Sequence, residues 1–286
     1  MLGMTWGDIS PWIFYDMGLP LLLVAAAAYL LGCSNGAVIV SKYILRDDVR
    51  THGSGNAGLT NFYRTFGGPL TLVVILCDVL KAVAAVWAGI LMARYWDGGF
   101  WSQEAIVLVF AKYWAGLFCL LGHMFPCMFH FKGGKGILSG GTIAIMIDWR
   151  IALVVWGGFL ILAILTRYVS LGSVWAGASF PVATWFVYQD WIITLLGLLL
   201  GGLVVYMHRG NIHRLLTGTE NKFSLHKKQC PRRGGLRPPE QPRKLNNGRP
   251  QAAPTTYLGR YYHENHSPWQ RRLGDGPGAA AAGKRT

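Results

Sequence analysis

Long apolar runs separated by short polar stretches make up most of the first 208 residues. A helix needs about 20 apolar residues to cross a bilayer, and six runs reach that length. They span roughly residues 17–43, 69–95, 104–130, 149–167, 169–189 and 190–208. A seventh run, 134–148, is short and rich in glycine, so it predicts either a tilted span or a re-entrant segment. The pattern predicts an all-α, polytopic integral membrane protein with about seven transmembrane helices.

Charges beside the first run predict how the helices are oriented. The acids Asp8 and Asp16 precede that run, and four basic residues follow it: Lys42, Arg46, Arg50 and Arg64. Because basic loops stay on the cytoplasmic side, we expect the N-terminus outside and the first polar loop inside. Seven spans then put the C-terminus in the cytoplasm, whereas six would leave the basic C-terminal residues outside.

Composition adds a second region to this picture. Charged residues are 14% of the 286 residues, well below the roughly 25% of a soluble domain. The net charge is +14, and from Met207 onward sixteen Lys and Arg stand against four acids. We expect a transmembrane domain over residues 1–222 and a basic, largely disordered tail over residues 223–286. The tail is expected to adhere to anionic lipid headgroups, and it lacks the aromatic and basic modules that bind nucleic acid.

Neither a metal site nor a cofactor is predicted. The five cysteines show no CxxC spacing, which argues against a zinc site or a structural disulfide. The few acids are scattered and are not paired at the spacing of metal ligands.

Three polar islands interrupt the apolar sequence, all on the expected cytoplasmic face. The first is Gly53–Asn61, followed closely by Arg64. The second, Gly122–Gly136, ends in Lys-Gly-Gly-Lys-Gly, and the third is His208–Arg214. Each also has a purely structural interpretation: a connecting loop, two lysines that satisfy the topology, and a histidine that caps a helix.

The second island favours anion binding. Its glycines let backbone N–H groups approach an oxyanion, and Lys132 and Lys135 supply positive charge. It is not a nucleotide-binding P-loop, because the Gly-x4-Gly-Lys-Ser/Thr spacing is missing and no hydroxyl follows Lys135. We therefore expect an anion site at the membrane boundary.

One pair of charges lies inside a predicted span. Asp78 and Lys81 are three residues apart in the second apolar run. Intramembrane charges are costly, and they are usually functional or paired. The sequence leaves both interpretations open, a functional role or a mutual ion pair that fixes helix packing.

Taken in order, the three islands resemble the signature motifs of the bacterial acyl-phosphate–glycerol-3-phosphate acyltransferase family. The resemblance covers roughly residues 25–222 and includes two further stretches, Thr166–Leu171 and Leu216–Glu220. It implies a seven-helix enzyme of the bacterial inner membrane whose motifs face the cytoplasm. It also implies transfer of a fatty acyl group from acyl phosphate to the sn-1 hydroxyl of glycerol 3-phosphate. The products would be lysophosphatidic acid and phosphate, in the first acylation of phospholipid synthesis.

The resemblance also implies which residues form the site. The expected catalytic residues are Ser54, Arg64, Lys135, His208 and Asn211. The expected substrate-binding residues are Gly55, Asn56, Thr60, Asn61, His123, Lys132, Gly133, Gly134 and Ser173. In the family pattern Gly133, Gly134 and Lys135 form the phosphate cradle.

An acyl phosphate is already activated, so the enzyme needs no covalent intermediate. The sequence shows neither a Ser-His-Asp order nor a Gly-x-Ser-x-Gly elbow. Arg64, Lys132 and Lys135 are expected to offset the repulsion between two anionic substrates. The hydroxyl proton is expected to pass to a phosphate oxygen of a substrate, with His123 as an alternative general base.

Two other classes of protein compete with this interpretation. Several spans with internal polar breaks also describe an organic-phosphate transporter, although no internal repeat is apparent. A scaffold that recruits partners through the basic tail would leave the glycine-rich turn unexplained.

Overall fold

The structure is a computed structural model that describes residues 18–95 and 105–223. The N-terminal lead with Asp8 and Asp16, the loop 96–104 and the tail after residue 223 lie outside the described residues. Every regular element of the described residues is helical. The main helices are α2 (Leu19–Cys33), α5 (Leu70–Tyr95), α6 (Ala105–Met124), α7 (Ile137–Ile147), α8 (Trp149–Thr166), α9 (Val169–Tyr188) and α10 (Trp191–Met207). The short ones are α3 (Gly36–Ile39), η2 (Val40–Ile44), η3 (Val49–Thr51), α4 (Leu59–Thr65), η5 (Cys127–Phe129) and α11 (Arg209–Leu216).

Each of the seven predicted apolar runs contains one of the main helices. Four stretches are long and apolar enough to cross a membrane: Leu19–Ile44, Leu70–Tyr95, Ile106–Phe129 and Trp149–Thr166. The pair α10 and α11, bent by 58°, makes a fifth if it is counted as one span. The 11 residues of α7 extend about 16 Å, roughly half of a hydrocarbon core. The all-α, polytopic membrane fold is confirmed, while the count of seven spans and the orientation stay predictions.

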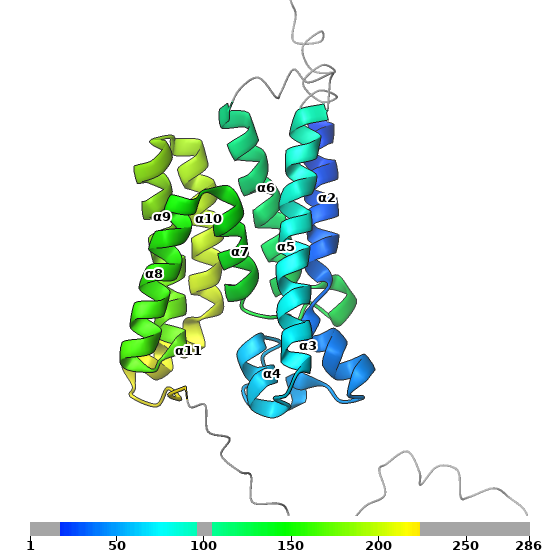
Figure 1. Cartoon of the computed structure of the whole chain (residues 1–286), viewed down its shortest axis with the longest axis vertical. Helices are drawn as coiled ribbons and strands as arrows, with labels where there is room; N and C mark the ends of the chain where they lie inside the picture. The colour runs from blue at the N-terminus through cyan, green and yellow to red at the C-terminus, as the bar shows by residue number, and fades with distance from the viewer. Residues whose placement is uncertain (1–17, 96–104, 224–286) are drawn as a thin grey trace, which may run out of the picture. The chain divides into compact units, whose positions relative to one another are not determined.

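The main helices form two groups, which are joined by α7 and by direct packing of α6 against α10. α2, α5 and α6 pack against one another, and α9 packs against both α8 and α10. α7 contacts α5, α6 and α8 (Figure 1). Helices in lipid associate through close packing of small residues. Gly32 shows this, because a Cβ at that position would overlap the Cys119 carbonyl of α6.

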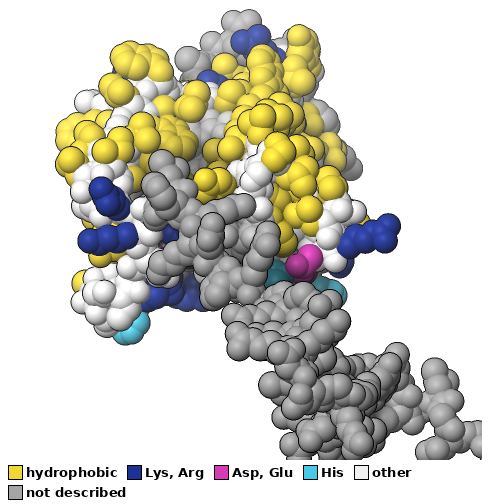
Figure 2. All heavy atoms as spheres, turned by 60° about the horizontal axis from the view of Figure 1, so that its bottom comes forward, with side chains coloured by type: hydrophobic (Ala, Val, Ile, Leu, Met, Phe, Trp, Pro, Cys, Tyr) yellow, Lys and Arg dark blue, Asp and Glu magenta, His cyan; other side chains and the backbone are white. Residues whose placement is uncertain are grey.

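The three polar islands lie at the same end of the helices. Figure 1 shows α3, α4 and α11 together at the lower end, with the connections that surround them. Figure 2 turns this end toward the viewer, and Lys, Arg and His side chains lie on it, whereas hydrophobic side chains cover the helices behind. The sequence prediction that all three islands share one face is therefore confirmed.

Asp78 and Lys81 form an ion pair inside the bundle. Lys81 Nζ lies 2.7 Å from Asp78 Oδ1, and the two side chains are 3% and 2% exposed. Lys81 Nζ also donates to Ser34 O at 3.0 Å and to His123 Nδ1 at 2.7 Å. The backbone N–H of Gly36 lies 3.4 Å from Asp78 Oδ1. The ion-pair interpretation is confirmed, and the pair ties α5 to α6 and to the break between α2 and α3.

Candidate active site

Asn61 organises the first loop, which we define as residues 45–58 between η2 and α4. Its Oδ1 accepts the backbone N–H of Ser54 at 3.1 Å. Its Nδ2 lies 3.0 Å from each of three loop carbonyls, those of Val49, His52 and Asn56. The side chain is buried, and its amide is occupied by the loop. Asn61 thus shapes the loop, and its predicted contact with substrate stays a prediction.

Gly133 and Gly134 fasten the second loop, defined as residues 125–136 between α6 and α7. Their N–H groups donate to Met124 O and His123 O, both at 3.1 Å. A Cβ on Gly134 would overlap the His123 ring, so only glycine allows this close approach to the end of α6. Both amides are paired with carbonyls in this conformation, and that they bind an oxyanion stays a prediction.

Lys135 and Asn211 form the polar centre of the site. Lys135 Nζ donates to Asn211 Oδ1, which joins the second loop to α11. Asn211 Nδ2 donates to Glu220 Oε1 at 2.8 Å, and Arg214 Nε donates to Glu220 Oε2 at 2.7 Å. These bonds orient the Asn211 amide so that its oxygen faces Lys135. Two predicted catalytic residues far apart in sequence are thus in direct contact.

The charges around Lys135 tune its protonation. Burial and the nearby Arg214 charge lower the pKa of Lys135 to about 8, with Glu220 opposing them. Burial alone would raise the pKa of Glu220, but the hydrogen bonds from Asn211 and Arg214 outweigh it and the pKa is lowered. The Ser170 hydroxyl lies close to the Glu220 carboxylate, although outside hydrogen-bond geometry. Lys135 is therefore mostly an ammonium at pH 7 and Glu220 a carboxylate.

His208 is held as a neutral ring at the bend between α10 and α11. Its Nδ1 lies 2.8 Å from the Val204 carbonyl, and because a carbonyl only accepts, Nδ1 carries the proton. Nε2 is then an acceptor. The residue is 3% exposed, and such burial disfavours a charged imidazolium. A neutral acceptor therefore lies beside the Lys135 ammonium.

His123 and Ser173 are buried and bonded within the helices. Because an ammonium has only donors, His123 Nδ1 must accept from Lys81, which leaves no free lone pair on the ring. Ser173 Oγ donates to Val169 O, one turn earlier in α9. Among the described residues, His123 is thus bonded to Lys81 and Ser173 to its own helix, and their predicted contacts with substrate stay predictions.

The remaining predicted residues lie at the surface around this centre. Ser54, Gly55, Arg64 and Lys132 are exposed, and Asn56 and Thr60 are half-buried. The first and second loops touch where Gly134 lies against the Ala57 carbonyl. On the other side, the Tyr63 ring of α4 stacks on Phe223 at 6.4 Å between centroids. The three islands therefore surround one region, although only Lys135 and Asn211 are in side-chain contact.

Glu220 and Arg214 were not expected as site residues. Leu216–Glu220 entered the sequence analysis only as part of the family resemblance, and Arg214 only as a charge of the third island. The one sequence signal for a site role was that Glu220 is an acid within a strongly basic stretch. Its side chain is 8% exposed, so it must have a buried cationic or amide partner.

An apolar cavity begins beside the second loop. Gly136, Ile137 and Gly140 line it from the start of α7, and Leu120 lines it from α6. α8, α9 and α10 complete it with Trp156, Phe159, Phe180, Leu200 and Val204. About 440 Å³ of space, open solvent included, lies within this lining. Apolar linings of this kind are typical of sites for a hydrocarbon chain, and Gly136 is the residue after Lys135.

Comparisons with known proteins agree with the resemblance. Residues 22–218 match the family model described as glycerol-3-phosphate acyltransferase. The glycerol-3-phosphate acyltransferase of Thermoanaerobacter pseudethanolicus is 36% identical over 202 residues, which are 71% of this chain and 95% of that protein. That of Gloeobacter violaceus is 37% identical over 208 residues, 72% of this chain and 97% of the relative.

A solved structure shows the same relationship. The crystal structure of PlsY (YgiH), an integral membrane glycerol 3-phosphate acyltransferase in its glycerol 3-phosphate form, matches with a TM-score of 0.61. The two sequences are 32% identical, and the match covers 71% of this chain and 96% of that one. The chain is therefore an integral membrane acyltransferase of phospholipid synthesis and belongs to the glycerol-3-phosphate acyltransferase family.

Proposed function

We propose that this enzyme transfers a fatty acyl group from acyl phosphate to the sn-1 hydroxyl of glycerol 3-phosphate. The products are lysophosphatidic acid and inorganic phosphate. The relatives are named for glycerol 3-phosphate, and PlsY is described in glycerol 3-phosphate and lysophosphatidic acid forms. One observation carries the proposal: Lys135, which contacts Asn211, directly precedes Gly136, and Gly136 lines an apolar cavity. An anionic head and an acyl chain are the two parts of a substrate that such a site accommodates.

Positive charge prepares the site for two anionic substrates. Lys135 and Arg214 lie close enough that the Arg214 charge lowers the pKa of Lys135. Arg64 in α4 and Lys132 in the second loop are exposed cations of the first two islands. Two phosphates repel each other, and cations held in place lower that repulsion before the substrates meet. Lys135 is therefore assigned to a substrate phosphate, with Asn211 holding its ammonium in place.

The reaction needs no covalent enzyme intermediate. The hydroxyl oxygen of glycerol 3-phosphate attacks the acyl carbonyl carbon, and the bond from that carbon to the phosphate oxygen breaks. The hydroxyl proton passes to a phosphate oxygen of a substrate. His208 Nε2, an acceptor, orients the hydroxyl, and the Lys135 charge stabilises the departing phosphate. His123 is not assigned as the base, because Lys81 occupies its Nδ1.

Purified protein in detergent tests the proposal directly. Acyl phosphate and labelled glycerol 3-phosphate should give lysophosphatidic acid, whereas acyl-CoA or acyl carrier protein as donor should not. Lys135→Ala should lower kcat/KM by about a hundredfold or more, and Ser54→Ala should also lose activity. Lys42→Ala, which removes an exposed lysine, is the matched control and should keep wild-type activity. Wild-type rates from Lys135→Ala or Ser54→Ala would refute the assigned pocket.

The same assay separates the enzyme from a carrier. An organic-phosphate transporter would move label only across sealed vesicles and would form no lysophosphatidic acid in detergent. The polar islands lie at one end of the bundle (Figure 1), which supports an enzyme working at one membrane face over a carrier with a midplane site.

We propose further that the protein lies in the bacterial inner membrane with seven spans, its N-terminus outside and its site facing the cytoplasm. The basic residues of the loops support this orientation. We assign residues 1–222 to the acyltransferase domain and residues 223–286 to a basic tail that adheres to anionic headgroups. Removing the chain after residue 230 should leave turnover in detergent nearly unchanged and weaken binding to anionic vesicles. A large loss of turnover would contradict the tail assignment.

A further inference from the structure

We propose that Arg50 is a positioning residue for the acyltransferase reaction, because it fastens the second loop to the first. The proposal rests on the proposed function, since the second loop carries Lys135 and the first carries Ser54. Arg50 entered the sequence analysis only as one of the basic residues that set the orientation. In the structure it makes specific hydrogen bonds, which a loop cation that only sets the membrane orientation would not need.

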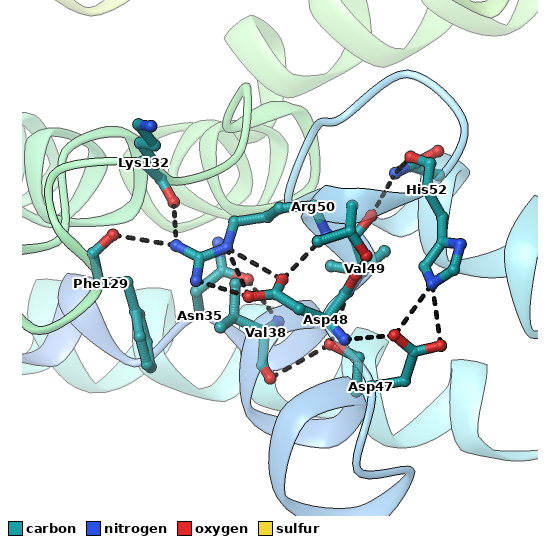
Figure 3. A network of polar contacts seen from close by, with 12 residues as sticks. Asn35, Val38, Asp47, Asp48, Val49, Arg50, His52, Phe129 and Lys132 are labelled. Atoms are coloured by element: carbon teal, nitrogen blue, oxygen red, sulfur yellow. Dashed lines mark hydrogen bonds and ion pairs between the residues drawn. The ribbon is translucent and has the colours of Figure 1, made fainter. Parts of the chain in front are cut away.

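Arg50 makes the hydrogen bonds between the two loops. Its Nη1 donates to Phe129 O at 2.9 Å and to Lys132 O at 3.3 Å (Figure 3). Within residues 18–95 and 105–223, these are the hydrogen bonds that join the first loop directly to the second. The loops also meet through the apposition of Gly134 and the Ala57 carbonyl and through a buried apolar cluster that includes Val49, Ala57 and Phe129. Removing the Arg50 side chain would leave these packing contacts without the hydrogen bonds.

Asp48 holds the guanidinium in the orientation that these bonds require. Arg50 Nε lies 3.0 Å from Asp48 Oδ1, and Arg50 Nη2 lies 2.7 Å from Asp48 Oδ2. This is a paired, fork-shaped contact that lysine cannot reproduce. The hydrogen bonds between the two side chains lower the pKa of Asp48 and raise that of Arg50. Because Asp48 neutralises Arg50, Arg50 acts by holding the loop and not by attracting phosphate.

The two carbonyls that Arg50 binds lie on either side of an unfavourable turn. His130 and Phe131 both have φ of 57°, in the left-handed region that residues other than glycine rarely adopt. Such a conformation persists only where the surroundings impose it. The bonds from Arg50 to Phe129 and Lys132 enclose this turn, so they help to impose it. Figure 3 shows the Lys132 side chain directed away from Arg50, with its carbonyl toward it.

The conformation of this turn affects the position of the Lys135 ammonium at the end of the second loop. Lys135 follows Lys132 by three residues, and its ammonium must meet Asn211 on α11. If the turn relaxes, the ammonium samples more positions and is in place for a smaller fraction of the time. Affinity for the substrate phosphate then falls in proportion to that fraction.

Arg50→Met and Arg50→Lys test the proposal, with Arg46→Met as the matched control. Arg46 lies in the same loop, is exposed, and makes no hydrogen bond or ion pair within the part of the chain that the structure describes. Arg50→Met should raise KM for glycerol 3-phosphate about tenfold or more and change kcat less. Arg50→Lys should resemble it, because a lysine ammonium cannot reproduce the planar, two-pronged contact with Asp48 while it also reaches the loop carbonyls. Arg46→Met should stay within about twofold of wild type.

A second measurement does not depend on activity. Amide hydrogen exchange over residues 126–136 should be faster in Arg50→Met than in the wild type, with α5 and α9 unchanged, and Arg46→Met should show no difference. If wild type forms no product, the proposed function fails, and exchange alone decides the role of Arg50. Unchanged exchange in Arg50→Met would overturn the proposal. So would a fall in kcat at constant KM that tracks a loss of folded protein, because that describes a structural residue only.

Discussion

Asp78→Asn and Lys81→Met probe a charge pair whose members are almost inaccessible to solvent. The two atoms are 2.7 Å apart and both side chains are at most 3% exposed. At an effective dielectric constant of about 20, their attraction is roughly 6 kcal/mol before desolvation is subtracted. Removing one partner leaves the other charge buried, which costs about 3–5 kcal/mol. Each single variant is therefore expected to be strongly destabilised.

The surroundings of the pair predict that the two single variants lose different amounts of stability. In Asp78→Asn, the Lys81 ammonium keeps two acceptors, Ser34 O and His123 Nδ1, so the loss should lie near 3 kcal/mol. In Lys81→Met, the Asp78 carboxylate keeps two long contacts, the Gly36 N–H at 3.4 Å and His123 Nδ1 at 3.7 Å, so the loss should lie near 5 kcal/mol. The double variant buries no charge. It still leaves two acceptors without a donor, at about 1–3 kcal/mol each, so it should be no worse than Lys81→Met.

Thermal unfolding in one detergent measures this cycle. With about 2–4 °C per kcal/mol for a chain of this size, Lys81→Met should unfold about 10–20 °C below the wild type. Asp148→Asn and Arg150→Met form the matched control, an ion pair at 2.9 Å with the Arg150 side chain 51% exposed. Its coupling should be at most about 1 kcal/mol. If the losses for Asp78 and Lys81 simply add in the double variant, the two side chains do not act as a pair and the reasoning is refuted.

Two further predictions concern the site and the packing. Because Lys135 has a pKa of about 8 and must be cationic to hold phosphate, kcat/KM should fall as the pH rises through 8. Arg214→Met removes a charge that lowers this pKa, so the fall should move to higher pH; a pH profile that does not move would contradict the assignment. Gly32→Ala should destabilise the fold by several °C in Tm, since its methyl group meets the Cys119 carbonyl. Gly202→Ala, with nothing within 4 Å of its Cβ, should leave Tm unchanged or raise it, and equal effects would contradict the packing argument.

Apolar runs predicted the helices well because a span must be apolar over its whole length. The same criterion could not decide the status of 134–148, where α7 is 11 residues long. Hydropathy says how apolar a segment is, and not how far through the bilayer it extends. The Asp78–Lys81 pair was foreseeable because a spacing of three brings two side chains onto one face of a helix.

The site was predictable in its location and less so in its details. The three islands did come together, and Lys135 does meet Asn211. The bonds from the Gly133 and Gly134 amides to the end of α6 were not foreseen, because they depend on how that helix ends. Arg50 was similarly hidden, since its partners are backbone carbonyls 79 and 82 residues away. Sequence patterns show side-chain chemistry, but they do not show which carbonyls a fold leaves exposed.

The Lys135–Asn211 contact has a practical meaning for handling the protein. One residue comes from the connection between α6 and α7, and the other from α11, at the far end of the second helix group. A phosphate bound by both residues would link the second loop to α11 and stabilise the folded bundle. Bound at a hundred times its dissociation constant, such a ligand adds about 2.7 kcal/mol to the stability of the folded state. Glycerol 3-phosphate added during extraction should therefore slow the unfolding of the enzyme in harsh detergents that separate its helices.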